Sequence, residues 1–477
     1  MSRDMAVRNP RTGENDYSIQ PLDVTEIGQV TDNLRAARSA WLESGVEHRC
    51  EIVRSWADSL LEQPDAILEA LTADTGRHLV SLVEIRALNG IVAGWCATAP
   101  GLLADGDERP SITAGVGVCP QFVPYELIGV ISPWNFPFLL SMIDSIPALI
   151  AGCSVIVKPS EVTPRFIKPL SRSLEAFPEL AAVFRWVEGD GSTGAAIIDT
   201  VDAIAFTGSV ATGRIVAEGC ARNFIPAFLE LGGKDPAIVL PTANLEKAAR
   251  IILRASVQAT GQACQSLERI YVPEEHYDAF VAVLVAMAEK VELNYPDVHQ
   301  GQIGPLIFAR QAEIIVAHIE DAVQKGAEIR CGGKIESYGG GTWIRPTVLT
   351  GVDHSMQVMT EETFGPVIPV MPYKDVDAAI RLANDTKYGL SAAVIGPDID
   401  EAIAVGRQIN VGAVSINDGG LTTDVHDAVH DSFRLSGMGA SRMGMSGITR
   451  FMRQKAILIR HAEALGIESL TEAQPET

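Results

Sequence analysis

The chain has 477 residues, of which 47% are hydrophobic and 21% are charged, a composition typical of a folded protein rather than a disordered one. This length allows two or three substructures, because single domains commonly hold ~100 to 200 residues. The 60 acidic residues outnumber the 38 basic ones and give a net charge of −22. Such a surface would repel phosphates and anionic lipids, which argues against nucleic acid as a partner.

No segment of the sequence is interpreted as membrane-spanning. The most apolar stretch, 136–157, contains Asp144 and Pro147 and is followed directly by Lys158. The first residues, MSRDMAVRNPRTGEN, are charged and lack the apolar core of a secretory signal. The seven cysteines are scattered and show no spacing typical of a disulfide framework or a zinc site. We therefore expect a cytoplasmic protein that makes no membrane contact.

Alternating element types run along the chain and predict an α/β fold. Apolar residues recur at helical spacing from about 22 to 71. Short β-branched runs then alternate with helical patterns, which is typical of buried parallel strands: 127–133, 152–160, 201–209, 235–240, 269–275, 366–373, 392–396 and 411–417. We expect two doubly wound Rossmann-like lobes. The stretches 111–125 and 455–461 look extended, and edge strands often pair across subunits, so we also expect a small β extension that joins a homodimer or homotetramer.

Cys264 in GQACQS and Glu230 in ELGGKDPA form the most informative pair of residues. A thiolate can attack a carbonyl carbon and hold the acyl group as a thioester, and a separate carboxylate can then activate water to release it. Glycines beside both residues suit tight backbone paths that expose a side chain. The pair predicts a nucleophile, Cys264, and a general base, Glu230.

Asn135 lies in PWNFPF, directly after a predicted strand. An amide donor fixed there could stabilise the oxyanion that forms when a thiolate attacks an aldehyde, together with the backbone amide of Cys264. A rigid loop packed on the core would explain the same residues if the thiol and the acid were missing.

Two strand ends could hold a nucleotide, because ligands of open α/β sheets bind at the carboxyl ends of the strands. Lys158 closes one strand in VIVKPSE, and Glu161 could bind a ribose and repel the additional phosphate of NADP. Gly208 and Gly213 bracket a helix start, where backbone amides attract phosphate. The alternative at Lys158 is a solvated turn with one ion pair. The alternative at Gly208 is a turn without a ligand, because the GxGxxG pattern is absent.

Six short motifs occur in one order along the chain: ISPWNFP, KPSE, FTGS, ELGGK, GQAC and EETFGPV. In order and approximate spacing they resemble the aldehyde dehydrogenase superfamily over nearly the whole chain. The resemblance implies that Cys264 is the nucleophile, Glu230 the general base and Asn135 the oxyanion donor. It also implies a set of cofactor contacts: Lys158 and Glu161 at the adenosine ribose, Ser209 at the pyrophosphate, Glu362 and Phe364 at the nicotinamide ribose and ring, and Ser132, Pro133, Trp134 and Gly208 elsewhere in the cofactor pocket.

The resemblance implies the NAD(P)-dependent oxidation of an aldehyde to a carboxylic acid, through a thiohemiacetal and a thioester on Cys264. Family members that transfer the acyl group to coenzyme A often lack the acid, so Glu230 favours hydrolysis. Glu161 favours NAD over NADP, although relatives with an acid at this position sometimes use both. The expected domains are dinucleotide-binding (1–110 and 127–232), catalytic thiol (233–445) and oligomerisation (111–126 and 446–477).

One segment departs from the family pattern. Relatives often carry a loop that resembles PFGGxKxSGxG and helps to wall the substrate tunnel, whereas this chain reads DSFRLSGMGASRMG from Asp431 to Gly444, without the glycine pair and the lysine. Just before it, His426 and His430 stand four apart, which could bind a metal on a helix. A polar loop or helix face explains them better, and we predict no metal because the chemistry requires none.

The sequence does not identify the substrate. It also does not show how Cys264 is activated, although a free thiol titrates near ~8.5 and is mostly protonated at neutral pH. Candidates for an apolar or aromatic tunnel, with core packing as the alternative, are Met142, Trp134, Phe138, Gln265 and residues near Leu421. A cysteine-dependent esterase or thioesterase without a redox role is the alternative function, and it would need no dinucleotide. A catalytically idle scaffold is a third, which the intact thiol, acid and amide argue against.

Overall fold

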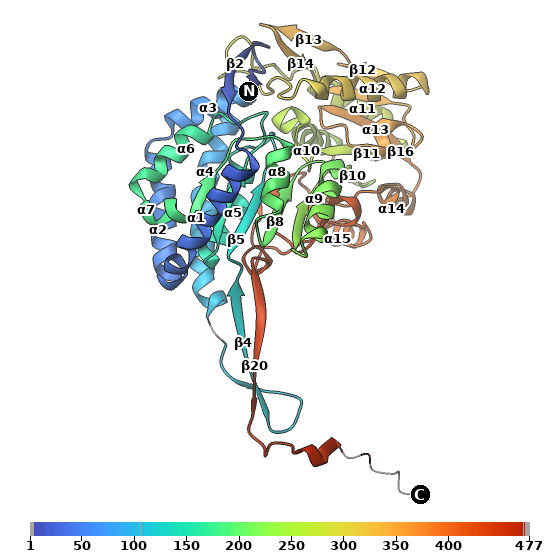
Figure 1. Ribbon diagram of the computed structural model, residues 1–477. Helices are drawn as coiled ribbons and strands as arrows, with labels where there is room; N and C mark the ends of the chain where they lie inside the picture. Colours follow the sequence, from blue (N-terminus) through green and yellow to red (C-terminus); the bar gives the residue numbers. More distant parts are fainter. Residues whose placement is uncertain (1–3, 105, 471, 473–477) are drawn as a thin grey trace, which may run out of the picture.

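The computed structural model describes residues 4–104, 106–470 and 472, and consists of two sheet-centred lobes from which an antiparallel arm projects (Figure 1). The sheet of the first lobe has six strands. Five are parallel and β19 is antiparallel to its neighbour. Their order is β19 (Gly437–Met438), β9 (Ala227–Glu230), β8 (Ala203–Thr207), β5 (Leu127–Ile131), β6 (Ser154–Lys158) and β7 (Phe184–Trp186).

Alternate residues of these strands enter two apolar clusters, one on each face of the sheet, because successive side chains of a strand point to opposite sides. Helices that cover one face are α1 (Val24–Glu43), α8 (Gly191–Ile198) and α9 (Val210–Arg222). Helices that cover the other are α2 (Val46–Glu62), α3 (Asp65–Thr75), α4 (His78–Leu103), α5 (Leu139–Ala151), α6 (Ile167–Ser173), α7 (Pro178–Val183) and α17 (Ser446–Thr449). Both faces are therefore covered, as in doubly wound folds.

Helix α4 is the one helix of the described residues that is long and apolar enough to cross a membrane. It packs against α2 and α5, and its buried side includes Glu84, whose carboxylate accepts from the backbone N–H groups of Phe138 at 3.1 Å and Leu139 at 3.0 Å. Glu84 thus holds the first turn of α5, just after the loop that carries Asn135. These contacts are those of a core helix in the first lobe.

The second lobe contains a seven-stranded sheet in which β12 alone is antiparallel to its neighbour. Its order is β12 (Glu328–Cys331), β15 (Thr347–Thr350), β16 (Val367–Tyr373), β11 (Leu267–Pro273), β10 (Asp235–Val239), β17 (Ser391–Ile395) and β18 (Ala413–Ile416). Helices α10 (Leu245–Val257) and α11 (Tyr277–Ala288) pack on one face. The other face is covered by α12 (Arg310–Gln324), α13 (Gln357–Thr360), α14 (Val376–Asn384) and α15 (Ile399–Gly406).

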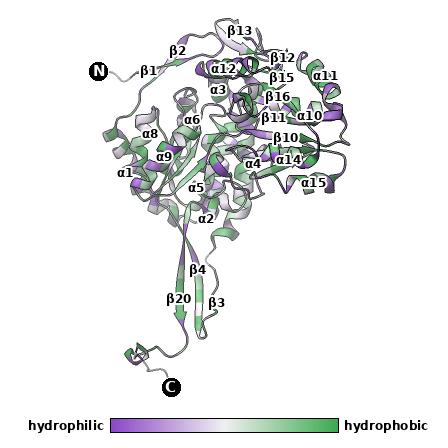
Figure 2. Cartoon of the chain, turned by 90° about the vertical axis from the view of Figure 1, so that its right-hand side faces the viewer, coloured by the Kyte–Doolittle hydropathy of each residue, from purple (hydrophilic) through white to green (hydrophobic). Residues whose placement is uncertain are grey.

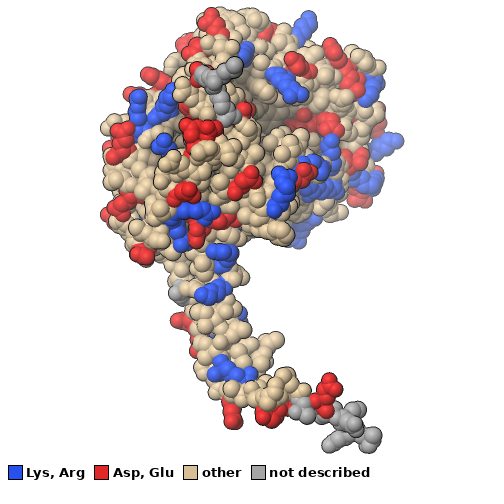
Figure 3. Space-filling model, in the orientation of Figure 1, with Lys and Arg blue, Asp and Glu red and all other residues tan. Residues whose placement is uncertain are grey.

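The arm consists of β3 (Arg109–Pro110), β4 (Val116–Pro124) and β20 (Met452–Arg460). β4 and β20 pair along their whole length, from Pro124 opposite Met452 to Val116 opposite Arg460. Figure 2 shows hydrophobic stretches along both strands, and Figure 3 shows Lys and Arg side chains spaced along the arm between uncharged surface. Two hairpins complete the sheets: β1 (Met5–Arg8) with β2 (Asn15–Ile19), and β13 (Ile335–Tyr338) with β14 (Gly341–Ile344).

The predicted α/β fold with two doubly wound lobes is confirmed, and each predicted strand overlaps an observed one. The two extended stretches pair with each other inside the chain to form the arm. The first and last of the proposed domain segments include residues 1–3 and 473–477, which lie outside the described residues. Close to its last boundary, Ile448 and Phe451 pack into the core of the first lobe, so the free part of the arm starts at β20.

Candidate active site

Cys264 lies in a tight loop between α10 and β11. Ala259 and Thr260 have positive φ values of 53° and 63°, which a β-branched residue such as threonine rarely adopts. At Gly261 a Cβ atom would come within 2.3 Å of the Gly365 backbone, so only glycine allows this close approach. A strained and closely packed backbone thus presents the thiol, as is common at functional sites.

Side-chain hydrogen bonds fix this loop to a neighbouring segment. Gln262 donates to the Pro305 carbonyl at 3.2 Å and accepts from the Ile307 N–H at 2.9 Å. Thr260 both donates to the Gly304 carbonyl and accepts from its N–H, each at 3.0 Å. The loop before Cys264 therefore has little freedom to move.

Asn135 reaches the thiol loop from the first lobe. Its side-chain N–H donates to the Gln262 carbonyl at 3.0 Å, two residues before Cys264. Its own carbonyl accepts from the Arg77 guanidinium, which also donates to the Ala259 carbonyl at 3.2 Å. Complete burial lowers the pKa of Arg77 to about 10. Arg77 belongs to no quoted motif, and no sequence signal identified it as the residue that joins the two loops.

Glu230 ends β9, and the glycines after it bring its strand against the thiol loop. A Cβ atom at Gly233 would lie 2.6 Å from the carbonyl oxygen of Cys264, so the two segments touch at this glycine. One carboxylate oxygen of Glu230 accepts from the Ser432 hydroxyl at 2.7 Å, and the other lies 3.8 Å from Nε of Arg442. Both Ser432 and Arg442 come from the atypical loop Asp431–Gly444.

The surroundings of Cys264 oppose its ionisation. Burial raises the pKa of the thiol to about 12, with further upward contributions from the carboxylates of Glu362, Asp235 and Glu230 and a downward one from Arg442. The thiol of this structure is therefore protonated at neutral pH, and it needs additional positive charge or a base to react.

Glu362 and Phe364 lie between α13 and β16, in a segment whose Gly365 touches the thiol loop at Gly261. The Glu362 carboxylate accepts from the Gly233 N–H at 3.1 Å, and burial raises its pKa to about 8. The ring of Phe364 meets that of Trp134 edge-on, with centroids 5.4 Å apart. Glu268, which sequence reasoning did not select, fixes this segment by accepting from the Phe364 N–H at 2.8 Å.

The remaining predicted cofactor residues gather at the carboxyl ends of β5, β6 and β8. Lys158 donates to Glu161 at 3.3 Å and to the carbonyls of Pro159 at 3.1 Å and Gly189 at 2.9 Å. Burial lowers the pKa of Lys158, while Glu161 acts to raise it. The sequence also allowed a solvated turn with one ion pair at Lys158. That ion pair is present, but the lysine is buried rather than solvated.

Ser132, Pro133 and Gly208 lie at neighbouring strand ends of the same edge, and Ser209 begins α9. The Ser132 N–H donates to the Lys158 carbonyl at 3.1 Å, and the Gly208 N–H donates to the Glu230 carbonyl at 3.1 Å. Ser209 accepts from the Thr212 N–H at 3.2 Å and so caps the helix.

This edge fits a dinucleotide. Ser132 is buried, yet its hydroxyl finds no hydrogen-bond partner within the described residues. An unpaired buried hydroxyl is costly unless a ligand satisfies it. With the start of α9 for a phosphate and Glu161 for a ribose, the donor and acceptor set matches such a molecule.

Two residues considered for the substrate tunnel lie elsewhere. Phe138 and Met142 are fully buried in the core of the first lobe, so the core-packing alternative is correct for both. Gln265 accepts from the Thr422 hydroxyl at 2.6 Å, beside the half-exposed Leu421 of α16 (Leu421–Asp424).

His426 and His430 follow α16 in irregular backbone, so the helical spacing considered for a metal is not formed. No cluster of three His, Cys, Asp or Glu side chains suited to a metal occurs in the part of the chain that the structure describes. The absence of a metal stays a prediction.

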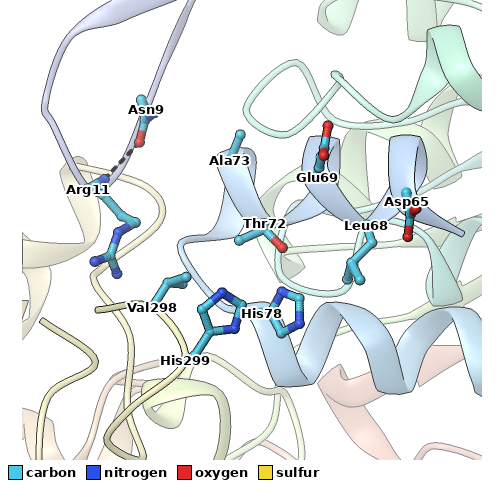
Figure 4. A pocket seen from close by; sticks show the side chains of 10 residues that line it. All are labelled: Asn9, Arg11, Asp65, Leu68, Glu69, Thr72, Ala73, His78, Val298 and His299. Carbon is cyan, nitrogen blue, oxygen red and sulfur yellow. Dashed lines mark hydrogen bonds between the residues drawn. The ribbon is translucent and has the colours of Figure 1, made fainter. Parts of the chain in front are cut away.

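A cavity of about 460 Å³ lies between the N-terminal hairpin and α3, and its ten lining side chains are drawn in Figure 4. The rings of His78 and His299 meet edge-on there, with centroids 4.3 Å apart. None of the predicted site residues lines this cavity, so it is separate from the thiol site.

Comparison with known proteins gives one consistent result. The model of the "Aldehyde dehydrogenase family" matches residues 1–457. A protein of Mycobacterium tuberculosis named "Putative succinate-semialdehyde dehydrogenase [NADP(+)] 2" is 33% identical over 95% of this chain and 89% of its own length.

Two solved structures are similar over nearly the whole chain. One, described as "Putative Aldehyde Dehydrogenase PutA" of Anabaena variabilis, is 52% identical with a TM-score of 0.95, over 98% of this chain and 99% of its own. The other, betaine aldehyde dehydrogenase of Staphylococcus aureus in complex with NAD+, is 28% identical with a TM-score of 0.90, over 97% and 93%. The match over residues 1–457 and these similarities establish that the chain belongs to the aldehyde dehydrogenase family and is an enzyme of that type.

Proposed function

We propose that this enzyme oxidises an aldehyde to a carboxylic acid through a thioester on Cys264, with NAD or NADP as the hydride acceptor. The observation that carries the proposal is the convergence of three segments on one thiol. The Asn135 amide bonds to the loop of Cys264, and Gly233, three residues after Glu230, packs on the Cys264 carbonyl. A nucleophile, an acid and an amide donor are thus available to one carbonyl compound.

In the first step the Cys264 thiolate adds to the aldehyde carbon and forms a thiohemiacetal, while the carbonyl oxygen becomes an oxyanion. A primary amide has two N–H donors, and Asn135 uses one of them on Gln262. The second N–H of Asn135 and the backbone N–H of Cys264 stabilise the oxyanion. Because Asn135 is itself fixed by Arg77, this donor is oriented before the substrate arrives.

The dinucleotide is held by the edge at β5, β6 and β8, with Ser132, Lys158 and Glu161 on the adenosine side and Ser209 near the phosphates. Glu362 and Phe364 lie nearer the thiol, on the nicotinamide side. When bound, the nicotinamide supplies the acceptor for the hydride that leaves the thiohemiacetal carbon. Trp134 and Phe364, in edge contact, exclude water from this space.

Hydrolysis completes the reaction. Glu230 takes a proton from a water molecule, whose oxygen adds to the thioester carbon, and the carbon–sulfur bond then breaks to release the carboxylic acid. Ser432 bonds to the carboxylate, so this base is held in a defined position. We propose water rather than coenzyme A as the acceptor because the acid is present beside the thiol.

We propose NAD as the preferred cofactor. Glu161 is about 40% exposed and pairs with Lys158, so its carboxylate can reach a ribose and would repel a 2′-phosphate. Among the similar proteins, one is named for NADP(+) and another is in complex with NAD+, which is compatible with either choice.

We also propose that the arm joins subunits of a homodimer or homotetramer, with 111–126 and 446–477 as oligomerisation segments. On β20, Ile457 and Leu458 are 46% and 69% exposed, which is unusual for adjacent apolar residues unless another surface covers them. The dinucleotide-binding segments 1–110 and 127–232, the thiol domain 233–445 and the cytoplasmic location remain proposals of the same kind.

A screen of aliphatic, aromatic and charged aldehydes with NAD and with NADP tests the proposed function. The absorbance of the reduced nicotinamide should increase with at least one class of aldehyde, and carboxylic acid should form in equal amount. Cleavage of simple esters without any dinucleotide, together with no aldehyde-dependent reduction, would contradict the proposal and support a cysteine-dependent esterase.

A further inference from the structure

The atypical loop Asp431–Gly444 surrounds the carboxylate of Glu230. Gly437 in β19 pairs directly with Glu230 in β9, which fixes the loop beside the acid. Ser432 donates to one carboxylate oxygen at 2.7 Å, and Nε of Arg442 faces the other at 3.8 Å. This Nε is buried and makes no hydrogen bond with any residue that the structure describes. An unpaired buried donor therefore points at the acid.

Arg442 cannot easily leave this position. Its terminal nitrogen donates to Asp144 of α5 at 3.2 Å and to the hydroxyl of Thr207 at the end of β8. The other oxygen of Asp144 accepts from Arg450, and Arg442, Arg450 and Asp144 are all buried. Two arginines around one aspartate leave one positive charge in excess, which the carboxylate of the largely buried Glu230 can balance.

Arg442 also acts on the thiol. Burial favours the neutral form of its guanidinium, but Asp144, Glu230 and Cys264 outweigh that effect and raise the pKa of Arg442, so it is charged. The ionisable side chains that act most strongly on the pKa of Cys264 are Glu362 after α13, Asp235 in β10, Arg442 and Glu230 in β9. Arg442 is thus the one cation in that set.

We propose that Arg442 is a positioning residue that holds the Glu230 carboxylate for attack by water and stabilises the Cys264 thiolate by its charge. This inference rests on the proposed function. It gives the atypical loop a role beyond walling a tunnel. When Glu230 takes the proton from water and the carbon–sulfur bond breaks, the electron pair returns to sulfur, and Arg442 stabilises the thiolate that leaves.

The test compares Arg442→Met with Arg442→Lys, with Arg434→Met as a matched control that removes one positive charge from the same loop at an exposed place. Two quantities are measured: the pH dependence of iodoacetamide alkylation at Cys264, followed by mass spectrometry of its peptide, and the rate of thioester hydrolysis after the burst of reduced nicotinamide. Thermal melting and dinucleotide binding report on the fold.

Arg442→Met should slow alkylation at pH 8.5 by about tenfold, because loss of a nearby cation disfavours the thiolate, and should slow hydrolysis by about ten- to a hundredfold. Arg442→Lys keeps the charge but loses the donor that faces Glu230, so alkylation should stay close to that of the unaltered enzyme while hydrolysis slows. Arg434→Met should change neither rate.

Unaltered alkylation and hydrolysis in folded Arg442→Met would overturn the inference. If that variant does not fold, Arg442→Lys decides: unaltered hydrolysis would refute the positioning of Glu230, and slowed alkylation would refute the role of the charge. Glu230→Gln and Cys264→Ala separate this result from the proposed function. If Cys264→Ala keeps its activity, the proposed function fails whatever Arg442 does.

Discussion

The cofactor edge and the thiol site differ in how the chain builds them. At the cofactor edge, Lys158 bonds to groups that lie 1, 3 and 31 positions away in the sequence. At the thiol site, Asn135 reaches Gln262 across 127 positions and Ser432 reaches Glu230 across 202. The first is a product of adjacent strand ends, whereas the second exists only when both lobes and the atypical loop are folded together.

The two regions also differ in charge. Lys158 is buried but has three acceptors for its ammonium group, so its charge is compensated locally. The thiol site instead brings carboxylates close together: burial raises the pKa of both Glu362 and Asp235 to about 8. A cofactor edge whose buried lysine is already compensated suits binding, and a thiol site that suppresses its own nucleophile suits chemistry that begins only after other groups arrive.

The largest expected effect is that of replacing Cys264, which should abolish catalysis at the thiol site and leave binding at the cofactor edge intact. Cys264→Ala should lower aldehyde oxidation by at least ~10⁴-fold, because no other group can form the thioester. Binding of NAD, followed by fluorescence titration, should remain, since the cofactor edge does not depend on the thiol. Oxidation at more than a hundredth of the original rate would show that another residue is the nucleophile.

A substitution of Glu230 should separate the reaction into a fast first turnover and a slow steady state. Glu230→Gln should leave a burst of about one reduced nicotinamide per active site and slow the steady state by ~10²- to 10⁴-fold, because only hydrolysis needs the base. Rapid-quench measurement of the acid product distinguishes the two phases. A burst that disappears along with the steady state would place Glu230 in the first step instead.

The amide donor should have the next largest effect. Asn135→Ala should lower kcat by ~10²- to 10³-fold, as expected for the loss of one oxyanion donor. Because Asn135 also bonds to Gln262, melting temperature and Cys264 alkylation must be measured on the same variant. If neither the rate of alkylation nor the rate of oxidation changes, the oxyanion is stabilised by other groups.

The same contrast explains what the sequence could predict. The lobes followed from strands such as 127–131 and 154–158, whose apolar character does not depend on distant contacts. Helix α4 was missed because Leu79 and Val83 are apolar yet 69% and 54% exposed, which blurs the periodicity that marks a helix.

In the site, short motifs identified the thiol, the acid and the amide because each motif is contiguous in the sequence. Arg77, Ser432 and Arg442 could not be found in this way. Their roles depend on which distant loops meet, and arginine and serine are common surface residues whose sequence neighbours do not reveal a buried partner.

Titration of the thiol site without cofactor should be visible over the accessible pH range. Since the pKa of Cys264 is raised to about 12, the thiolate fraction, and with it the rate of alkylation, should increase about tenfold per pH unit from 7 to 10 without a plateau. Mass spectrometry of the Cys264 peptide excludes signal from the other cysteines. A plateau below pH 9 would show that the free enzyme already holds a thiolate.

The smallest effect belongs to the cofactor edge. Glu161→Ser removes the carboxylate that pairs with Lys158 and would repel a 2′-phosphate, so kcat/KM with NADP should rise relative to NAD by about tenfold. The change should leave Cys264 alkylation unaltered, because Glu161 pairs with Lys158 at the cofactor edge and not with a group of the thiol site. Equal use of both cofactors by the unaltered enzyme would refute the preference for NAD. A change in alkylation would show that the two regions are coupled, contrary to the way the chain builds them.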